Sequence, residues 1–205
     1  MAEYPVTLNI DYPEKSDRIK TLLRIFLALP ILVILGFLTA HAYESPPGTG
    51  DYERIYSVGI VVVPVVLMIL FRQKYPKWWF DWNLELTRFS TRVGAYLLLL
   101  RDDYPATDAE QGVHLSMTYP DVKRDLNRWL PLVKWFLAIP HVFILVFLMA
   151  GVTLCTILSW FIILVTGNYP RAIFDFVVGT LRWSLRVYAY ALILVTDEYP
   201  PFSLK

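Results

Sequence analysis

The chain has 205 residues, of which 56% are hydrophobic and only 18% are charged, and its mean hydropathy is +0.46. A soluble domain usually has about a quarter of its residues charged, so this composition argues against a soluble protein and favours a membrane protein. The formal net charge is +1. A charge this small gives no long-range field that would attract nucleic acid, and we expect no nucleic-acid partner.

Five sequence blocks occur twice, in the same order. Their polar landmarks, the Tyr-Pro pairs, Phe-Asp and the paired arginines, are not expected from chance similarity between apolar helices. We therefore interpret residues 1–106 and 107–205 as tandem copies of one unit. The block pairs are VTLNIDYP and VHLSMTYP, RIFLALP and KWFLAIP, YPKWWFDW and YPRAIFDF, RFSTRVGAY and RWSLRVYAY, and LLLLRDDYP and LILVTDEYP.

Each unit begins with a short segment in which apolar residues alternate with polar ones. This period of two is typical of a strand, so we expect a short strand-like arm at the start of each unit. The alternating residues are Val6, Leu8 and Ile10 in the first unit, and Val113, Leu115 and Met117 in the second.

Apolar segments follow each arm. In the first unit the segments 25–40 and 55–71 are separated by a polar loop, and each is slightly short of the roughly 20 residues that span a bilayer. In the second unit the apolar run 135–165 is too long for one ordinary span, so we expect a tight turn near Ala150-Gly151. The predicted transmembrane hairpins cover about residues 20–73 and 129–167.

Basic residues indicate how these hairpins are oriented. They gather before the first apolar segment of each unit and after the last, whereas the loop between segments 25–40 and 55–71 is mainly acidic. The positive-inside rule then places the base of both hairpins, and both termini, in the cytoplasm.

A helix with a polar stripe ends each unit, at about residues 78–101 and 173–196. Asp175, Arg182 and Arg186 recur at helical spacing, so they share one face. Arginines in the middle of a spanning helix are expensive, so we expect two amphipathic helices in the membrane interface and four spans. The alternative is six spans with buried arginines. The matching residues of the first unit are Asp81, Arg88 and Arg92.

The stripes have three interpretations. They are a salt-bridge ladder within each helix or simply a solvated face, a docking surface for an acidic partner, or a site for anionic lipid headgroups, since arginine pairs with phosphate in bidentate fashion. In the third interpretation Arg88, Arg92, Arg182 and Arg186 bind headgroups and Asp81 and Asp175 are their partners in the stripe. Trp78, Trp79, Trp82 and Trp183 are expected as interfacial aromatic residues.

The blocks DYPEKSDR, KWFLAIPH and TGNYPRAIFDFVVGTLRWSLRVYAYALILVTDEYPPFSL resemble a bacterial membrane-protein family named domain of unknown function 4389. The resemblance is close over residues 113–204, and the first unit is similar with departures, among them Ile31 where the second unit has His141. It implies a multi-pass protein of the bacterial inner membrane and implies no activity, because the family is uncharacterised.

No motif for a specific reaction is present in the sequence: it contains no HExxH, GxSxG, GxGxxG or phosphate loop. The acidic pairs Asp102-Asp103 and Asp197-Glu198 are typical of acid–base catalysis or cation binding, or simply of an exposed turn that ends a helix. We expect no catalytic residues, no metal and no cofactor. The leading hypothesis is a non-catalytic membrane scaffold or accessory subunit that binds anionic lipid and packs against another membrane protein or a second copy. The alternatives are a small transporter or channel, and an interfacial lipid-modifying enzyme.

Overall fold

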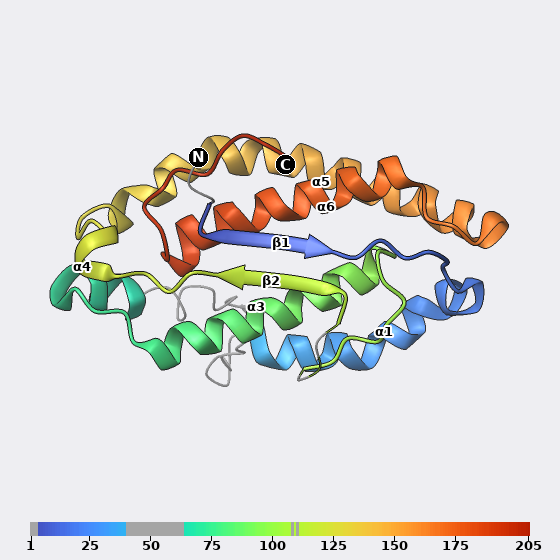
Figure 1. The fold of residues 1–205 in the computed structure, drawn as a ribbon, viewed down its shortest axis with the longest axis horizontal. Helices are drawn as coiled ribbons and strands as arrows, with labels where there is room; N and C mark the ends of the chain where they lie inside the picture. Colours follow the sequence, from blue (N-terminus) through green and yellow to red (C-terminus); the bar gives the residue numbers. More distant parts are fainter. Residues whose placement is uncertain (1–3, 40–63, 108, 110) are drawn as a thin grey trace, which may run out of the picture.

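The structure, a computed structural model, describes residues 4–39, 64–107, 109 and 111–205 (Figure 1). The described part is mostly helical and contains one small sheet of two strands. In Figure 1 the strands lie between helices α6 and α3, while α5 and α1 follow the outer edges. The elements are β1 (Val6–Ile10), α1 (Arg18–Thr39), η1 (Met68–Arg72), α3 (Lys77–Leu97), β2 (Val113–Met117), α4 (Val122–Asp125), α5 (Pro131–Thr166), α6 (Arg171–Tyr188) and η2 (Ala189–Ile193).

The two strands form an antiparallel ribbon whose register is centred on Leu8 and Leu115. Val6 pairs with Met117, and the pairing extends equally far in the other direction. The apolar side chains of both strands are buried, whereas most of the polar ones between them are exposed. The strand-like arms predicted from the period-two pattern are therefore confirmed.

Each strand packs against a helix from the other half of the chain. β1 lies along α6 and β2 lies along α3 (Figure 1). The hydroxyl of Tyr12, just after β1, donates a hydrogen bond to the carbonyl of Tyr169, just before α6. The hydroxyl of Tyr119, just after β2, donates one to the carbonyl of Tyr75, just before α3, at 2.5 Å. The Tyr-Pro landmarks of the sequence thus link residues 1–106 and 107–205 crosswise.

Helix α1, over Arg18–Gly36, and helix α5 are long and apolar enough to cross a membrane. Only 22% and 17% of these windows are buried within the described chain, so neither resembles the core helix of a soluble protein. On α1 the buried residues form a narrow stripe that includes Thr21, Arg24, Ala28 and Ile31. The rest of its circumference exposes large apolar side chains, as expected of a helix in contact with lipid.

The predicted turn at Ala150-Gly151 is wrong, because α5 is one continuous helix of 36 residues. At 1.5 Å per residue it is about 54 Å long, more than the roughly 30 Å hydrocarbon core of a bilayer. The physical reason is that one glycine costs a helix only about 1 kcal/mol, and Gly151 lies against α6, where a Cβ would meet the ring of Phe176 at 3.5 Å. The hydroxyl of Thr153 also donates a hydrogen bond to the carbonyl of Met149, one turn earlier, at 3.0 Å. This polar side chain is therefore satisfied within the continuous helix.

The predicted span at residues 55–71 lies mainly outside the described residues. From residue 64 the described chain is helical and continues into η1, which ends at Arg72. The hairpin predicted over about residues 20–73 is therefore described only at its two ends.

The two helices predicted to be amphipathic bury their apolar faces against other parts of the described chain. On α6 the side chains of Phe174, Val178 and Trp183 are buried within the described chain, and on α3 those of Phe80 and Val93 are buried too. The sequence pattern identifies an apolar face but not what covers it. Here the ribbon, α5 and α1 cover these faces.

Two buried cations hold the starts of α1 and α5. Arg24 is 3% exposed and forms an ion pair with Asp102, and Lys134 is fully buried and contacts Asp197 at 2.7 Å. Each cation also donates to a backbone carbonyl, Tyr96 O at 2.8 Å and Thr196 O at 2.6 Å. These aspartates belong to the acidic pairs Asp102-Asp103 and Asp197-Glu198 identified in the sequence. Each lies just after a helix and forms an ion pair with a cation of a candidate membrane span.

Candidate functional site

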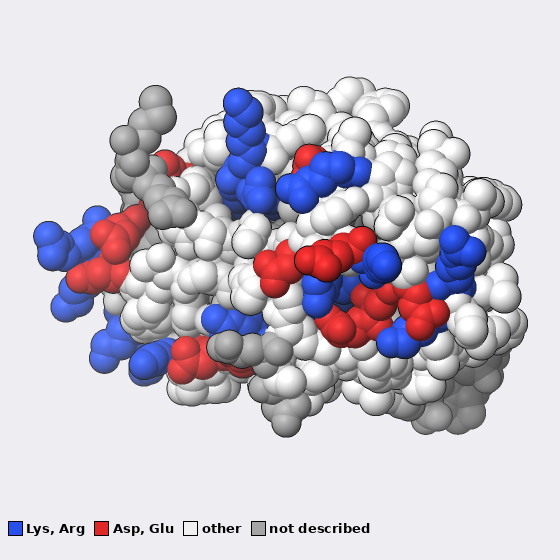
Figure 2. Space-filling model, turned by 45° about the vertical axis from the view of Figure 1, so that its right-hand side comes forward, with Lys and Arg blue, Asp and Glu red and all other residues white. Residues whose placement is uncertain are grey.

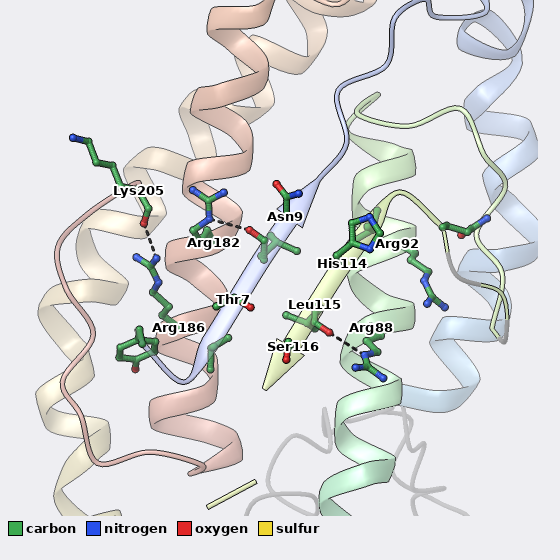
Figure 3. A pocket seen from close by; sticks show the side chains of 15 residues that line it. Thr7, Asn9, Arg88, Arg92, His114, Leu115, Ser116, Arg182, Arg186 and Lys205 are labelled. Atoms are coloured by element: carbon green, nitrogen blue, oxygen red, sulfur yellow. Dashed lines mark hydrogen bonds between the residues drawn. The ribbon is translucent and has the colours of Figure 1, made fainter. Parts of the chain in front are cut away.

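A partly open cavity of about 660 Å³ lies on the ribbon, between α3 and α6 (Figure 3). Residues of both strands line it, among them the outward-facing Thr7, Asn9 and Ser116. The other residues that line it are Tyr4, Val6, Leu8, Arg88, Arg92, Gln111, Val113, His114, Leu115, Arg182, Arg186 and Lys205.

Helical spacing brings four arginines to this cavity. Arg88 and Arg92 are four residues apart on α3, and Arg182 and Arg186 are four residues apart on α6, so each pair lies on one side of its helix. Figure 3 shows the α3 pair on one side of the ribbon and the α6 pair on the other. The four residues singled out from the sequence as headgroup ligands thus line a single cavity.

Arg88 and Arg182 also hold the edges of the ribbon. The Nε–H of Arg88 donates to the carbonyl of Leu115 at 3.0 Å, and the Nε–H of Arg182 donates to the carbonyl of Leu8 at 3.0 Å (Figure 3). Both strands of a two-stranded ribbon are edge strands with outward carbonyls that need donors. These two arginines therefore have a structural role that the sequence pattern did not reveal.

Arg92 and Arg186 contact the loops beside the cavity. Arg92 Nη1 donates to the carbonyl of Ala106 at 2.9 Å, and Arg186 Nη2 donates to the carbonyl of Lys205 at 2.6 Å. The Nε atoms of both arginines are buried and have no hydrogen-bond partner among the described residues. Burial, followed by the positive charge of Arg182, lowers the pKa of Arg186 from its ordinary value. An arginine stays protonated in proteins, so Arg186 keeps its positive charge at this partly buried place beside Arg182.

The lining of the cavity is rich in positive charge. It includes four arginines, and none of the described residues in it is Asp or Glu. Lys205 lines the cavity as well, but with its carbonyl, while its ammonium group points away from the cavity (Figure 3). Glu85 reaches Arg88 from outside the lining, with Nη1 and Oε1 2.5 Å apart, and both side chains are partly exposed. At the rim His114 Nε2 lies 3.2 Å from the carboxylate of Asp11. An anion in the cavity would therefore meet several guanidinium groups and form charge-assisted hydrogen bonds.

The aspartates predicted as partners in the stripes do not reach the cavity. Asp175 is exposed and pairs with Arg171, at 3.2 Å, one turn earlier on α6. Asp81 is exposed and forms no ion pair with any residue that the structure describes. The side chains at helical spacing share a face, but that face is long, and each aspartate lies about two turns before Arg182 or Arg88.

The four predicted interfacial tryptophans differ in exposure. Trp78 and Trp82 are 69% and 52% exposed, and Trp79 is partly buried against the core. Trp183 is buried, so its prediction as an interfacial residue is wrong. Its Nε1–H donates to Nδ1 of His141 at 3.0 Å, which gives a buried polar pair that sequence reasoning missed.

Figure 2 shows how charge is distributed on one face of the molecule. Lys and Arg gather next to Asp and Glu in a few clusters, and broad areas between and around them carry no charged side chain. The exposed apolar residues of α1 and α5 account for much of the uncharged surface of the molecule. On this face charge is therefore concentrated in clusters that contain both signs.

Residues 129–203 match the model of a family described as domain of unknown function DUF4389. The resemblance expected from the sequence is thus confirmed for a single stretch that contains α5, α6 and η2. It includes Arg182 and Arg186 and excludes Arg88 and Arg92. Neither the curated proteins nor the solved structures contain a match to this chain.

Proposed function

We propose that the protein is a non-catalytic membrane scaffold or accessory subunit that binds anionic lipid headgroups in the arginine-lined cavity. The observation that carries this proposal is the gathering of four arginines in one cavity whose described lining has no carboxylate side chain. Guanidinium groups pair with phosphate in bidentate fashion, and a phosphate here would supply the charge that the lining lacks.

The membrane part of the proposal is supported by the surfaces of α1 and α5. Soluble monomers rarely expose apolar patches larger than a few hundred Å². Both helices expose Leu, Ile, Val and Phe around most of their circumference, for example Phe26 at 70% and Phe143 at 65%. In our proposal lipid covers most of this surface, and another membrane protein or a second copy of the chain covers the rest.

We further propose that the two halves of the chain are tandem copies and that both termini lie on the cytoplasmic side of a bacterial inner membrane. Matched contacts support the repeat, because the Arg24–Asp102 and Lys134–Asp197 pairs occupy the same positions of the recurring blocks. A common side for the termini is supported by Tyr4, whose hydroxyl donates to the carbonyl of Glu198 at 3.2 Å.

A pair of double variants tests headgroup binding. Arg92→Gln/Arg186→Gln removes two cavity charges and keeps the bonds of Arg88 and Arg182 to the ribbon. Lys123→Gln/Arg124→Gln removes two exposed charges on α4 and serves as the matched control. We expect anionic lipid that co-purifies in mild detergent to fall several-fold in the first variant and to stay unchanged in the control. Equal lipid content in both variants, with both folded, would contradict the proposed function.

A further inference from the structure

The ribbon gives the cavity a local two-fold arrangement. Leu8 and Leu115 face each other at its centre, and their carbonyls point outward in opposite directions, one to Arg182 and one to Arg88. Arg92 and Arg186 lie one turn further along their helices. One arginine pair therefore stands on each side of the ribbon, at matching places (Figure 3).

The ribbon also sets how far apart the pairs are. Because their carbonyls point outward, Leu8 and Leu115 form a pair without mutual hydrogen bonds, in which the Cα atoms are about 4.5 Å apart. Adding the two carbonyls and the two hydrogen bonds of 3.0 Å places the Nε atoms of Arg88 and Arg182 roughly 13 Å apart. A single phosphate, which forms hydrogen bonds of about 3 Å, cannot contact both pairs.

Both pairs keep donors for a ligand. Arg88 and Arg182 each use Nε and Nη1 in contacts, and their Nη2 groups form no hydrogen bond with any residue that the structure describes. The same holds for Nη2 of Arg92 within the described chain. The pairs are not identical, because the carbonyl of Lys205 already accepts from Nη2 of Arg186.

Between the pairs, the outer face of the ribbon is polar and largely uncharged. Thr7 and Ser116 face each other across the two strands, and Asn9 faces His114. Hydroxyl and amide groups at these places suit a short polar linker that carries hydroxyl groups.

We propose that the cavity takes one diphosphatidyl headgroup, in which a glycerol joins two phosphates, with one phosphate on Arg88 and Arg92 and the other on Arg182 and Arg186. This inference rests on the proposed headgroup function and names its ligand. With each phosphate in hydrogen-bond contact with its pair, the phosphates are roughly 7 Å apart, a distance that a glycerol bridge covers. The volume of about 660 Å³ accommodates such a headgroup.

The test compares two lipids at equal charge. The full-length protein is placed in nanodiscs of zwitterionic lipid with either diphosphatidylglycerol or twice the molar amount of phosphatidylglycerol, and native mass spectrometry counts the lipids retained. We expect one diphosphatidylglycerol per chain, bound about tenfold more tightly than phosphatidylglycerol, since joining two anionic groups makes the second contact intramolecular. Arg92→Gln and Arg186→Gln should each abolish this preference, whereas Lys123→Gln/Arg124→Gln should leave it unchanged.

Three outcomes would overturn parts of this assignment, and they are distinguishable. If both lipids bind equally per charge, the two-phosphate ligand is wrong while headgroup binding stands. If the wild-type protein retains neither lipid, the proposed function itself fails. If soluble glycerol bisphosphate binds as tightly as the lipid, the ligand is a free bisphosphate and no lipid is required.

Discussion

One matched position carries an apolar cluster in the first half of the chain and a polar pair in the second. Ile31 on α1 packs with Phe89 and Val93 of α3. At the corresponding places His141 on α5 accepts a hydrogen bond from Trp183 of α6, at 3.0 Å. The histidine stands where the first half has Ile31, and the tryptophan stands where it has Phe89. The two polar residues occur together because burying Nδ1 of the imidazole without a hydrogen-bond donor would cost folding free energy.

The polar pair is also covered by aromatic rings of the C-terminal segment. Phe202 stacks on the ring of His141 with centroids 4.0 Å apart, and Tyr199 lies 4.8 Å away. The segment that follows α6 is therefore tied to this pair. The two halves therefore place the same pair of positions in contact. In the second half these positions also contact the C-terminal segment, through Tyr199 and Phe202.

The buried ion pairs Arg24–Asp102 and Lys134–Asp197 are a second matched feature of the two halves. Breaking them is expected to lower the free energy of unfolding more than any other change proposed here. Asp197→Ala leaves Lys134 buried without its carboxylate, and Asp102→Ala does the same to Arg24. Breaking a buried pair from one side costs about 3–5 kcal/mol, so both variants should lose a large part of the free energy of unfolding measured in detergent. We expect the greater loss for Asp197→Ala, because an ammonium group is more strongly hydrated than a guanidinium and therefore costs more to leave unpaired.

Asp103→Ala is the control for these two variants. Asp103 is half exposed and pairs with Arg101 at 2.5 Å, and an exposed pair of this kind contributes about 0–1 kcal/mol. A similar loss in all three variants would show that Asp102 and Asp197 act through the turn itself and not through the buried cations.

The His141–Trp183 pair gives the second effect, of intermediate size. Trp183→Phe removes the donor and leaves Nδ1 of His141 unpaired, at an expected cost of about 1–3 kcal/mol in unfolding free energy. His141→Ile combined with Trp183→Phe recreates the apolar pair of the first half and should recover part of that loss. A double-mutant cycle measures the coupling, and strictly additive effects would contradict an energetic link between the two side chains.

Much of the fold is local enough to follow from sequence. The alternation around Leu8 and Leu115 predicts the strands, the apolar content of α1 and α5 predicts candidate spans, and the spacing of Arg182 and Arg186 predicts one helix face. The crosswise packing of β1 on α6 does not follow, because pairing between distant segments leaves no periodic signal. For the same reason the sequence placed the four arginines on two separate helices and did not predict that one cavity joins them.

The second half has one more residue than the first after its last helix-ending tyrosine, and the structure accommodates it in a π-helical turn. Tyr96 is followed directly by Leu97, whereas Tyr190 is followed by Ala191 and then Leu192. The extra residue falls in η2, a π-helical turn, which is the usual way a helix takes up an insertion. After it, Leu194 has φ 64°, the same value as the matching Leu99 in the first half, so the chain leaves both helices through a left-handed residue at the matching position.

Two glycines give the smallest expected effect and test whether the C-terminal segment is held in place by shape. A Cβ on Gly179 would lie 2.6 Å from the carbonyl of Leu204, whereas a Cβ on Gly94 would meet nothing within 4 Å. Gly94→Ala should therefore stabilise the protein by about 0.5–1 kcal/mol through helix propensity alone. In Gly179→Ala the same gain is offset, because the backbone at Leu204 must move away and the hydrogen bonds from Arg182 and Arg186 to this segment weaken.

Hydrogen exchange of the amides of residues 202–205 should then speed up in Gly179→Ala and stay unchanged in Gly94→Ala. Equal exchange in both variants would show that the segment is held by its aromatic contacts with His141, and that its close approach to α6 contributes little.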